Sequence, residues 1–183
     1  LVFDPLLSRR PRYFKLLEIN SRAFEQQRQL AAFPGQLEPS AFTFFGQILG
    51  RLFPADLGGF DRRVAQLFQS ELGIPIDPAM LRMRVSTVKW QARLYSLLLR
   101  RLRPKMVIVS DTGEYGLRLA SQRLGIPFAE VQHGVFDALH PDAIPDSAPG
   151  DNAGLLIPDL YLAKGFYWIQ ALAGFRHGGG AVP

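Results

Sequence analysis

The stretch "KMVIVSDTGEYGLRLASQRLGIPFAEVQHG" spans residues 105–134 and decides the fold. It opens with a short apolar run rich in β-branched residues, which is typical of a buried strand. The next segment places Leu117, Ala120 and Leu124 on one helical face and ends at Gly125. A second apolar run follows and stops at a His-Gly pair. Strand, helix and strand within about 30 residues indicate a βαβ unit, which predicts parallel strands in a covered sheet.

The residues after this unit extend the sheet. Residues 135–154 show no apolar periodicity and are predicted to form a loop. "IPDLYLAKG", residues 157–165, predicts a third strand, and "FYWIQALAGF", residues 166–175, predicts a short helix. We expect residues 176–183 to be disordered, because they are terminal and rich in glycine. Residues 105–175 are therefore predicted to be an α/β core.

Residues 1–104 are predicted to be mainly helical and to pack on the sheet. Apolar spacing predicts helices over residues 12–32, 40–52 and 61–72. The third of these starts at an aspartate and ends at Gly73, which is the usual chemistry of helix caps. The first of these segments ends before Phe33-Pro34-Gly35, where the proline-glycine pair favours a turn.

A long helix is predicted from the Asp77-Pro78 pair to about Leu102, with aspartate as N-cap and proline in the first turn. One face of its later part carries apolar residues, namely Val88, Ala92, Tyr95, Leu98 and Leu102. Another face carries basic residues, namely Arg82, Lys89, Arg93, Arg100 and Arg103. The helix is therefore amphipathic, with its apolar side expected toward a core and its basic side outward.

The charge of the chain has three interpretations. The net charge is +5, and no acidic residue occurs from Leu81 to Lys105. The basic stripe can be a solvated helix face, or it can attract an anionic bilayer surface with help from Trp90 and the Phe-rich residues 42–53. Nucleic acid is not expected as a partner, because no recognised binding motif or interleaved stacking aromatics accompany the stripe.

Composition excludes several classes of protein. The 183 residues contain no cysteine, so the chain has neither disulfides nor a thiolate zinc site. No signal peptide is recognisable, and no apolar run approaches the roughly 20 residues of a membrane span. We expect a cytoplasmic protein, and the basic stripe would allow it to associate peripherally with the inner face of the membrane. Because the chain begins with Leu1, we also expect it to be a fragment of a longer protein.

Ligands of open parallel sheets bind at the carboxyl ends of the strands. Three predicted strand ends lie there, at residues 110–113, 132–134 and 164–165. The segment "SDTGEYG" offers backbone amides at a helix start, which suit an anion or a sugar hydroxyl, although its side chains can equally serve as helix caps. It lacks both the G-x-G-x-x-G pattern and a Gly-Lys-Ser/Thr sequence, so classical NAD or ATP binding is not predicted.

His133 ends the second strand and is the candidate catalytic residue. A histidine side chain takes a proton near neutral pH, and the adjacent Gly134 lets a substrate approach the backbone. The alternative is a histidine that only shapes the turn. His140 lies in the following loop without an evident third ligand, so no metal site is predicted.

The order "VIVSD", "GLRLASQRLGIP", "EVQHG", a loop with a further His and Pro, and "PDLYLAKGFYWIQAL" resembles bacterial GT-B glycosyltransferases that build capsule and other surface polysaccharides. The resemblance covers about residues 105–175. It implies a Rossmann-like core that forms the N-terminal, acceptor-side half of a GT-B architecture. In the similar teichoic-acid glycerophosphotransferases, a His-Gly at the corresponding strand end is thought to supply the base for the acceptor hydroxyl.

By this resemblance, His133 would deprotonate the hydroxyl of a glycan or lipid-linked acceptor, and a nucleotide sugar would be the donor, with no further cofactor. The residues implied for substrate binding are Asp111, Thr112, Gly113, Gln132, Gly134, His140, Asp142 and Lys164. Such enzymes need a second domain or subunit to hold the donor, so the 183 residues are expected to be inactive alone. The alternative is a non-catalytic module, derived from a transferase half, that binds carbohydrate or protein.

Overall fold

The computed structural model describes residues 15–16, 36–37, 40–109, 113–132, 156–163 and 165–172. The chain forms two compact units, residues 1–45 and 46–183. In the first unit, β1 (Lys15–Leu16) pairs in parallel with β2 (Gln36–Leu37). The helix predicted over residues 12–32 is therefore wrong at these two positions. Residues 15–19 read Lys-Leu-Leu-Glu-Ile, and an apolar period of two at their end fits a strand as well as a helix.

A three-stranded parallel sheet forms the centre of the second unit. Its strands are β3 (Val107–Val109), β4 (Phe128–Val131) and β5 (Leu160–Leu162), and their order in the sheet follows the sequence. β4 pairs with both neighbours, and all four of its residues are buried. Helix α6 (Tyr115–Leu124) connects β3 to β4, and α7 (Phe166–Leu172) follows β5. The predicted α/β class, its parallel strands and its flanking helices are confirmed.

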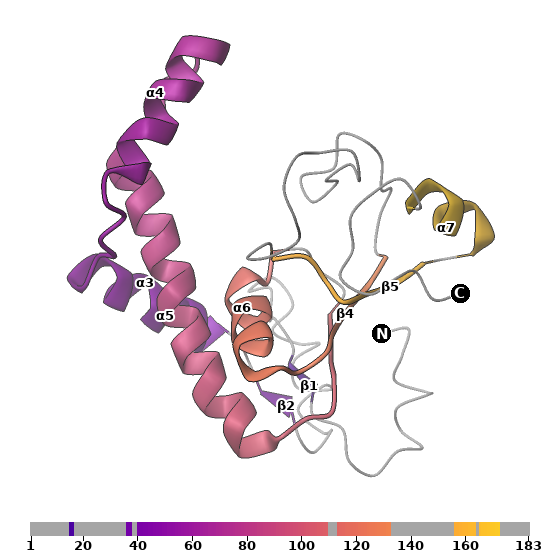
Figure 1. The fold of residues 1–183 in the computed structure, drawn as a ribbon. Coiled ribbons are helices and arrows are strands. Elements are labelled where there is room, and N and C mark those ends of the chain that lie inside the picture. Colours follow the sequence, from indigo (N-terminus) through magenta and orange to yellow (C-terminus); the bar gives the residue numbers. More distant parts are fainter. Residues whose placement is uncertain are drawn as a thin grey trace, which may run out of the picture. The chain divides into compact units, whose positions relative to one another are not determined.

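Helix α6 lies between the sheet and the long helix α5 (Pro78–Leu102), as Figure 1 shows. Small side chains allow the two helices to approach closely. A Cβ atom at Gly116 would stand 2.5 Å from Cβ of Gln91, and Ala92 and Ala120 are fully buried. Tyr95 fills the same contact with 1% of its surface exposed. The centre of the unit is therefore a stack of α5, α6 and the sheet.

The buried face of α5 differs in part from the predicted apolar face. Ala92 and Tyr95 are buried as expected, but Leu99 is buried in place of Leu98, and Leu102 is exposed. The difference is a rotation of one residue in the last turns, which side-chain spacing alone does not determine. The predicted start of α5 is confirmed, since the Asp77 carboxylate accepts a hydrogen bond of 2.9 Å from the Ala79 amide.

Helix α3 (Ser40–Leu52) agrees with the predicted bounds, and two glycines on it face α5. A Cβ atom at Gly46 would stand 2.5 Å from Cγ of Gln91, and one at Gly50 would stand 2.9 Å from the Thr87 nitrogen. These two positions lie four residues apart, on one face of the helix. A side chain at Gly46 would displace the Gln91 side chain, and one at Gly50 would press on the backbone of α5, so both positions favour glycine.

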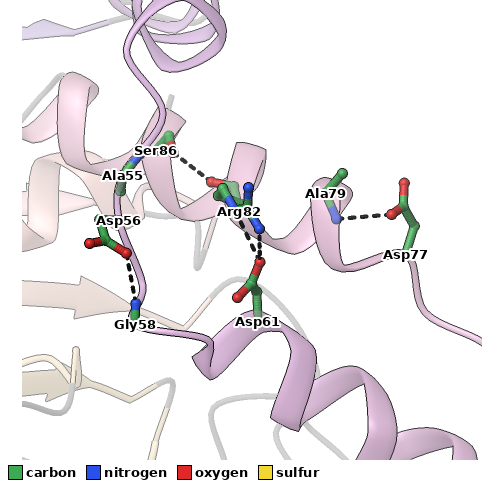
Figure 2. Close-up of polar contacts among 8 residues, drawn as sticks. All are labelled: Ala55, Asp56, Gly58, Asp61, Asp77, Ala79, Arg82 and Ser86. Atoms are coloured by element: carbon green, nitrogen blue, oxygen red, sulfur yellow. Dashed lines mark hydrogen bonds and ion pairs between the residues drawn. The ribbon is translucent and has the colours of Figure 1, made fainter.

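Helix α4 (Phe60–Leu72) is joined to α5 by an ion pair. Figure 2 shows Arg82 of α5 directed at Asp61, whose carboxylate accepts bonds of 3.0 Å from Nε and 2.5 Å from an Nη atom. The prediction that Asp61 caps this helix is wrong, because Gly59 holds the cap position and Asp61 lies inside the first turn. The other end is as predicted, with Gly73 in the left-handed conformation that ends the helix.

Candidate functional site

The carboxyl ends of β3, β4 and β5 lie along one edge of the sheet, because the three strands are parallel and adjacent. At the centre of this edge stands Gln132, the residue after β4. Its backbone amide donates a hydrogen bond of 3.1 Å to the Leu162 carbonyl, so pairing with β5 continues past the strand end. Its side chain is buried. The backbone that leads into His133 is therefore fixed up to the preceding residue.

The start of α6 lies at the same edge. Gly113 forms the turn before this helix, and its carbonyl accepts a hydrogen bond of 2.9 Å from the Tyr115 amide. Glu114 holds the cap position, and its carboxylate accepts a bond of 3.4 Å from the Tyr95 hydroxyl of α5. An acidic side chain at a helix N-terminus also interacts favourably with the helix dipole. This corner of the edge is thus held in place from α5.

The third strand end leads into α7 through Gly165. This residue has φ of 97°, which lies in the region that favours glycine. Its carbonyl accepts bonds from the Trp168 and Ile169 amides at 3.2 and 3.4 Å. The turn explains why a glycine stands between the strand and the helix. It also means that α7 begins at the sheet edge, next to the end of β5.

A buried ion pair lies beneath the edge. Arg118 of α6 donates a hydrogen bond of 2.6 Å to the Glu130 carboxylate of β4, and both side chains are at most 3% exposed. Arg118 also bonds the Leu156 carbonyl, which lies in the segment that enters β5. Its guanidinium stands over the Phe128 ring at 5.4 Å. One side chain therefore ties α6, β4 and the approach to β5 together.

The Pro158-Asp159 pair has a structural role at the opposite edge. The Asp159 carboxylate accepts a hydrogen bond of 2.8 Å from the Phe128 amide, and the Asp159 amide donates one of 2.9 Å to the Phe128 carbonyl. Pro158 is buried. These contacts fix where β4 and β5 begin, far from the carboxyl ends of the strands. Asp159 is consequently a residue of the fold and not of the candidate site.

Two of the predicted site residues fall in the described part of the chain. Gly113 and Gln132 both lie at the carboxyl edge, where the sequence places them. The candidate base His133 lies outside the described residues, immediately after Gln132. Six further candidates also lie outside them, namely Asp111, Thr112, Gly134, His140, Asp142 and Lys164.

Neither a metal-ligand cluster nor a membrane span is found within residues 40–109, 113–132, 156–163 and 165–172. No three His, Cys, Asp or Glu side chains in these ranges come together as metal ligands do. None of the described helices combines the length and the apolar character that a bilayer crossing requires.

Arg118 and Glu130 are not among the residues predicted from the sequence, although the sequence carries a signal for them. Glu130 is a lone charge in the otherwise apolar strand "FAEV", and Arg118 follows Leu117 on a helix face rich in small and apolar residues. A charge in a buried element needs a partner of opposite sign. The two lone charges therefore indicate that each needs a partner, and packing between the elements decides which residue that partner is.

Comparisons with known proteins do not assign the chain to a family. No protein-family model, no curated protein and no solved structure matches the chain. What the chain does must therefore be inferred from its own residues and from the fold that they form.

Proposed function

We propose that the carboxyl edge of β3, β4 and β5 binds the sugar acceptor of a glycosyltransferase, and that the chain is the acceptor-side, Rossmann-like half of a GT-B enzyme. The observation that carries the proposal is the parallel, sequential order of the three strands. This order brings the three strand ends to one edge, which is where open parallel sheets bind ligands.

The residues at the edge suit a hydroxyl-rich ligand. Gln132 ends the central strand, and the Leu162 carbonyl of β5 holds its backbone amide, so the chain reaches the edge at a fixed position. Gly113 and Gly165 flank it without side chains, so a ligand can approach the backbone. The motif order around "EVQHG" and "PDLYLAKGFYW", which resembles surface-polysaccharide glycosyltransferases, supports the same assignment.

His133 is the base in this proposal. Its imidazole takes the proton of the acceptor hydroxyl while the oxygen forms a bond to the anomeric carbon of the donor sugar. The bond from that carbon to the nucleoside diphosphate breaks, and the leaving group departs with the electron pair. General base catalysis of this kind contributes typically about 10²- to 10⁴-fold to the rate. The donor would be held by a second domain or subunit.

The test begins with acceptor binding by the 183-residue chain. Saturation-transfer NMR with methyl glycosides of common hexoses and N-acetylhexosamines should show contact with at least one of them. The His133→Ala variant should weaken that contact about tenfold, while thermal unfolding stays within a few degrees of the wild type. Asp56→Ala is the matched control, because this exposed residue lies in the turn before α4. Glycoside binding that is absent, or equal in all variants, contradicts the proposal.

Transfer distinguishes an enzyme half from a binding module. With the donor-binding partner present, His133→Ala should lower transfer by about 10²-fold or more. Acceptor binding should fall only by the tenfold given above and stay measurable. If glycosides bind but no nucleotide sugar is turned over under any of these conditions, the chain is a non-catalytic carbohydrate-binding module. Transfer that survives the His133→Ala change would remove this residue from the role of base.

A further inference from the structure

Helix α4 and Ile74, which follows it after Gly73, expose large apolar side chains to solvent. The exposed fractions are 56% for Phe60, 58% for Leu67 and 61% for Leu72, and 50% for Ile74 just past the helix end. Buried Asp61 and Ala65 mark the side of α4 that faces α5. Phe60 and Leu67 are seven residues apart and share another side of the helix. Leu72 is seven residues after Ala65 and so lies on the side of α5. The exposed apolar residues Phe60 and Leu67, which share a face, indicate an interaction surface.

The far end of α4 receives little support from α5. From the pair of Asp61 and Arg82, Figure 2 shows α4 running toward the side from which α5 begins at Asp77, so the two helices are antiparallel. About 16 Å of α4 follows Asp61, whereas only about 6 Å of α5 precedes Arg82. The half of α4 that carries Leu67 and Leu72 therefore extends past the start of its neighbour. Short helices without a packing partner are marginal in water.

The exposed face of α4 is symmetric in sequence about Leu67. Arg63 precedes Leu67 by four residues and Glu71 follows it by four, and both are exposed. Phe60 precedes Leu67 by seven residues and lies on the same face, whereas Ile74 lies past the helix end, after Gly73 in the left-handed conformation. Residues four and seven apart share a helix face. The order basic, apolar, acidic of Arg63, Leu67 and Glu71 consequently matches its own reverse when opposite charges are paired.

We propose that α4 is the contact surface of a symmetric dimer, in which the α4 helices of two copies pack antiparallel and cross at Leu67. Arg63 of one copy then stands level with Glu71 of the other, and the same pair recurs on the other side of the axis. A two-fold axis makes every such contact twice, as isologous interfaces require.

The charge pattern favours a second copy over other occupants. An anionic bilayer would be repelled by Glu71 on this face. Bilayer binding also does not require charges spaced evenly about Leu67. In the single chain, Glu71 accepts a bond of 3.3 Å from the exposed Ser70 hydroxyl. That contact is long and joins sequence neighbours, so an arginine can replace it readily.

The test exchanges the charges and measures mass by sedimentation velocity over a range of protein concentrations. Arg63→Glu and Glu71→Arg should each weaken dimerisation about tenfold or more, because each places like charges opposite one another twice. An equimolar mixture of the two variants should dimerise again, since both pairs are then opposite in charge. Arg62→Glu carries the same charge change on another face of α4 and should dimerise like the wild type.

Leu67→Ala tests the apolar centre and keeps a strong helix former at that position. We expect it to weaken the dimer at least tenfold without reducing helical circular dichroism. A wild-type chain that stays monomeric at all concentrations overturns the proposal. So does a mixture of the two charge variants that fails to associate while the wild type dimerises, because the pairing of Arg63 with Glu71 would then be wrong.

Discussion

Among the residues that the structure describes, the second unit has two arginine–carboxylate pairs that differ in how deeply they are buried. Arg118 and Glu130 expose 2% and 3% of their side chains, whereas Arg82 exposes 40% and its partner Asp61 exposes 2%. The first pair joins α6 to the central strand, and the second joins α4 to α5. The difference indicates which contacts belong to the cooperative core of the protein and which hold a peripheral helix.

The surroundings of the two pairs also separate a buried core from a peripheral helix. Around Arg118 lie the buried residues of α6 and β4, and Phe128 stands against its guanidinium. Around Asp61, the neighbouring residues of α4 are mostly exposed. Regions with few buried apolar contacts open locally at lower free energy than the core does. We therefore expect changes at Arg118 to unfold the whole unit and changes at Asp61 to release α4.

The largest effect is expected for Arg118→Met. This change leaves Glu130 buried without its partner, and breaking a buried pair in this way typically costs about 3–5 kcal/mol. Chemical denaturation monitored by circular dichroism measures the loss. The double variant Arg118→Met/Glu130→Met should recover part of the stability, because it removes both charges and fills the space with apolar atoms. A double variant no more stable than Arg118→Met would mean that the other contacts of Arg118 carry its effect.

A smaller effect is expected for Gly116→Val, which tests the contact of α6 with α5. The added side chain meets Gln91, since an ideal Cβ already stands 2.5 Å from Cβ of that residue. Overpacking of this kind costs typically about 1–3 kcal/mol, and the free energy of unfolding from denaturant titration measures it. Leu97→Ala is the control, because Leu97 is 65% exposed on α5, the helix that Gly116 contacts. We expect it to change the free energy of unfolding by no more than about 0.5 kcal/mol. Equal stability of both variants would contradict tight packing at this contact.

The sequence predicted elements better than contacts, and the reason is the range of the interactions. The βαβ unit, the start of α5 and the bounds of α3 follow from periodicity and caps, which act over a few residues. Asp61 also looks like a cap locally. Its partner Arg82 lies 21 residues away, and no local pattern reports such a pair. The glycines of α3 and α6 likewise acquire their meaning only from the neighbouring helix.

The candidate site divides in a similar way. The parallel βαβ pattern was sufficient to place Gly113 and Gln132 at one sheet edge, because parallel strands all end on the same side. The support beneath that edge was not predicted. The Tyr95 hydroxyl reaches Glu114 across 19 residues, and Arg118 reaches Glu130 across 12. Packing between elements determines these partners, whereas the sequence alone determines the order of the elements.

The smallest effect is expected for Asp61→Asn, and it should be local. The hydrogen bond from Arg82 holds the pKa of the Asp61 carboxyl below its usual value of 3.8, although burial acts in the opposite direction. Since the unfolded chain then binds the proton more readily, the contribution of this group to stability is complete above the unfolded pKa and is lost as pH falls through the folded pKa. Asparagine at this position removes the charge at every pH.

Hydrogen exchange of individual amides measures this effect, with both proteins at the same concentration. In the wild type, protection of the α4 amides should fall as pH drops below about 4, after correction for intrinsic exchange rates. In Asp61→Asn, the protection of α4 should already be reduced at pH 7 and should no longer depend on this titration. The α6 amides should keep equal protection in both proteins at pH 7. If α6 loses protection together with α4, the two helices unfold as one unit and the division drawn from the two ion pairs is wrong.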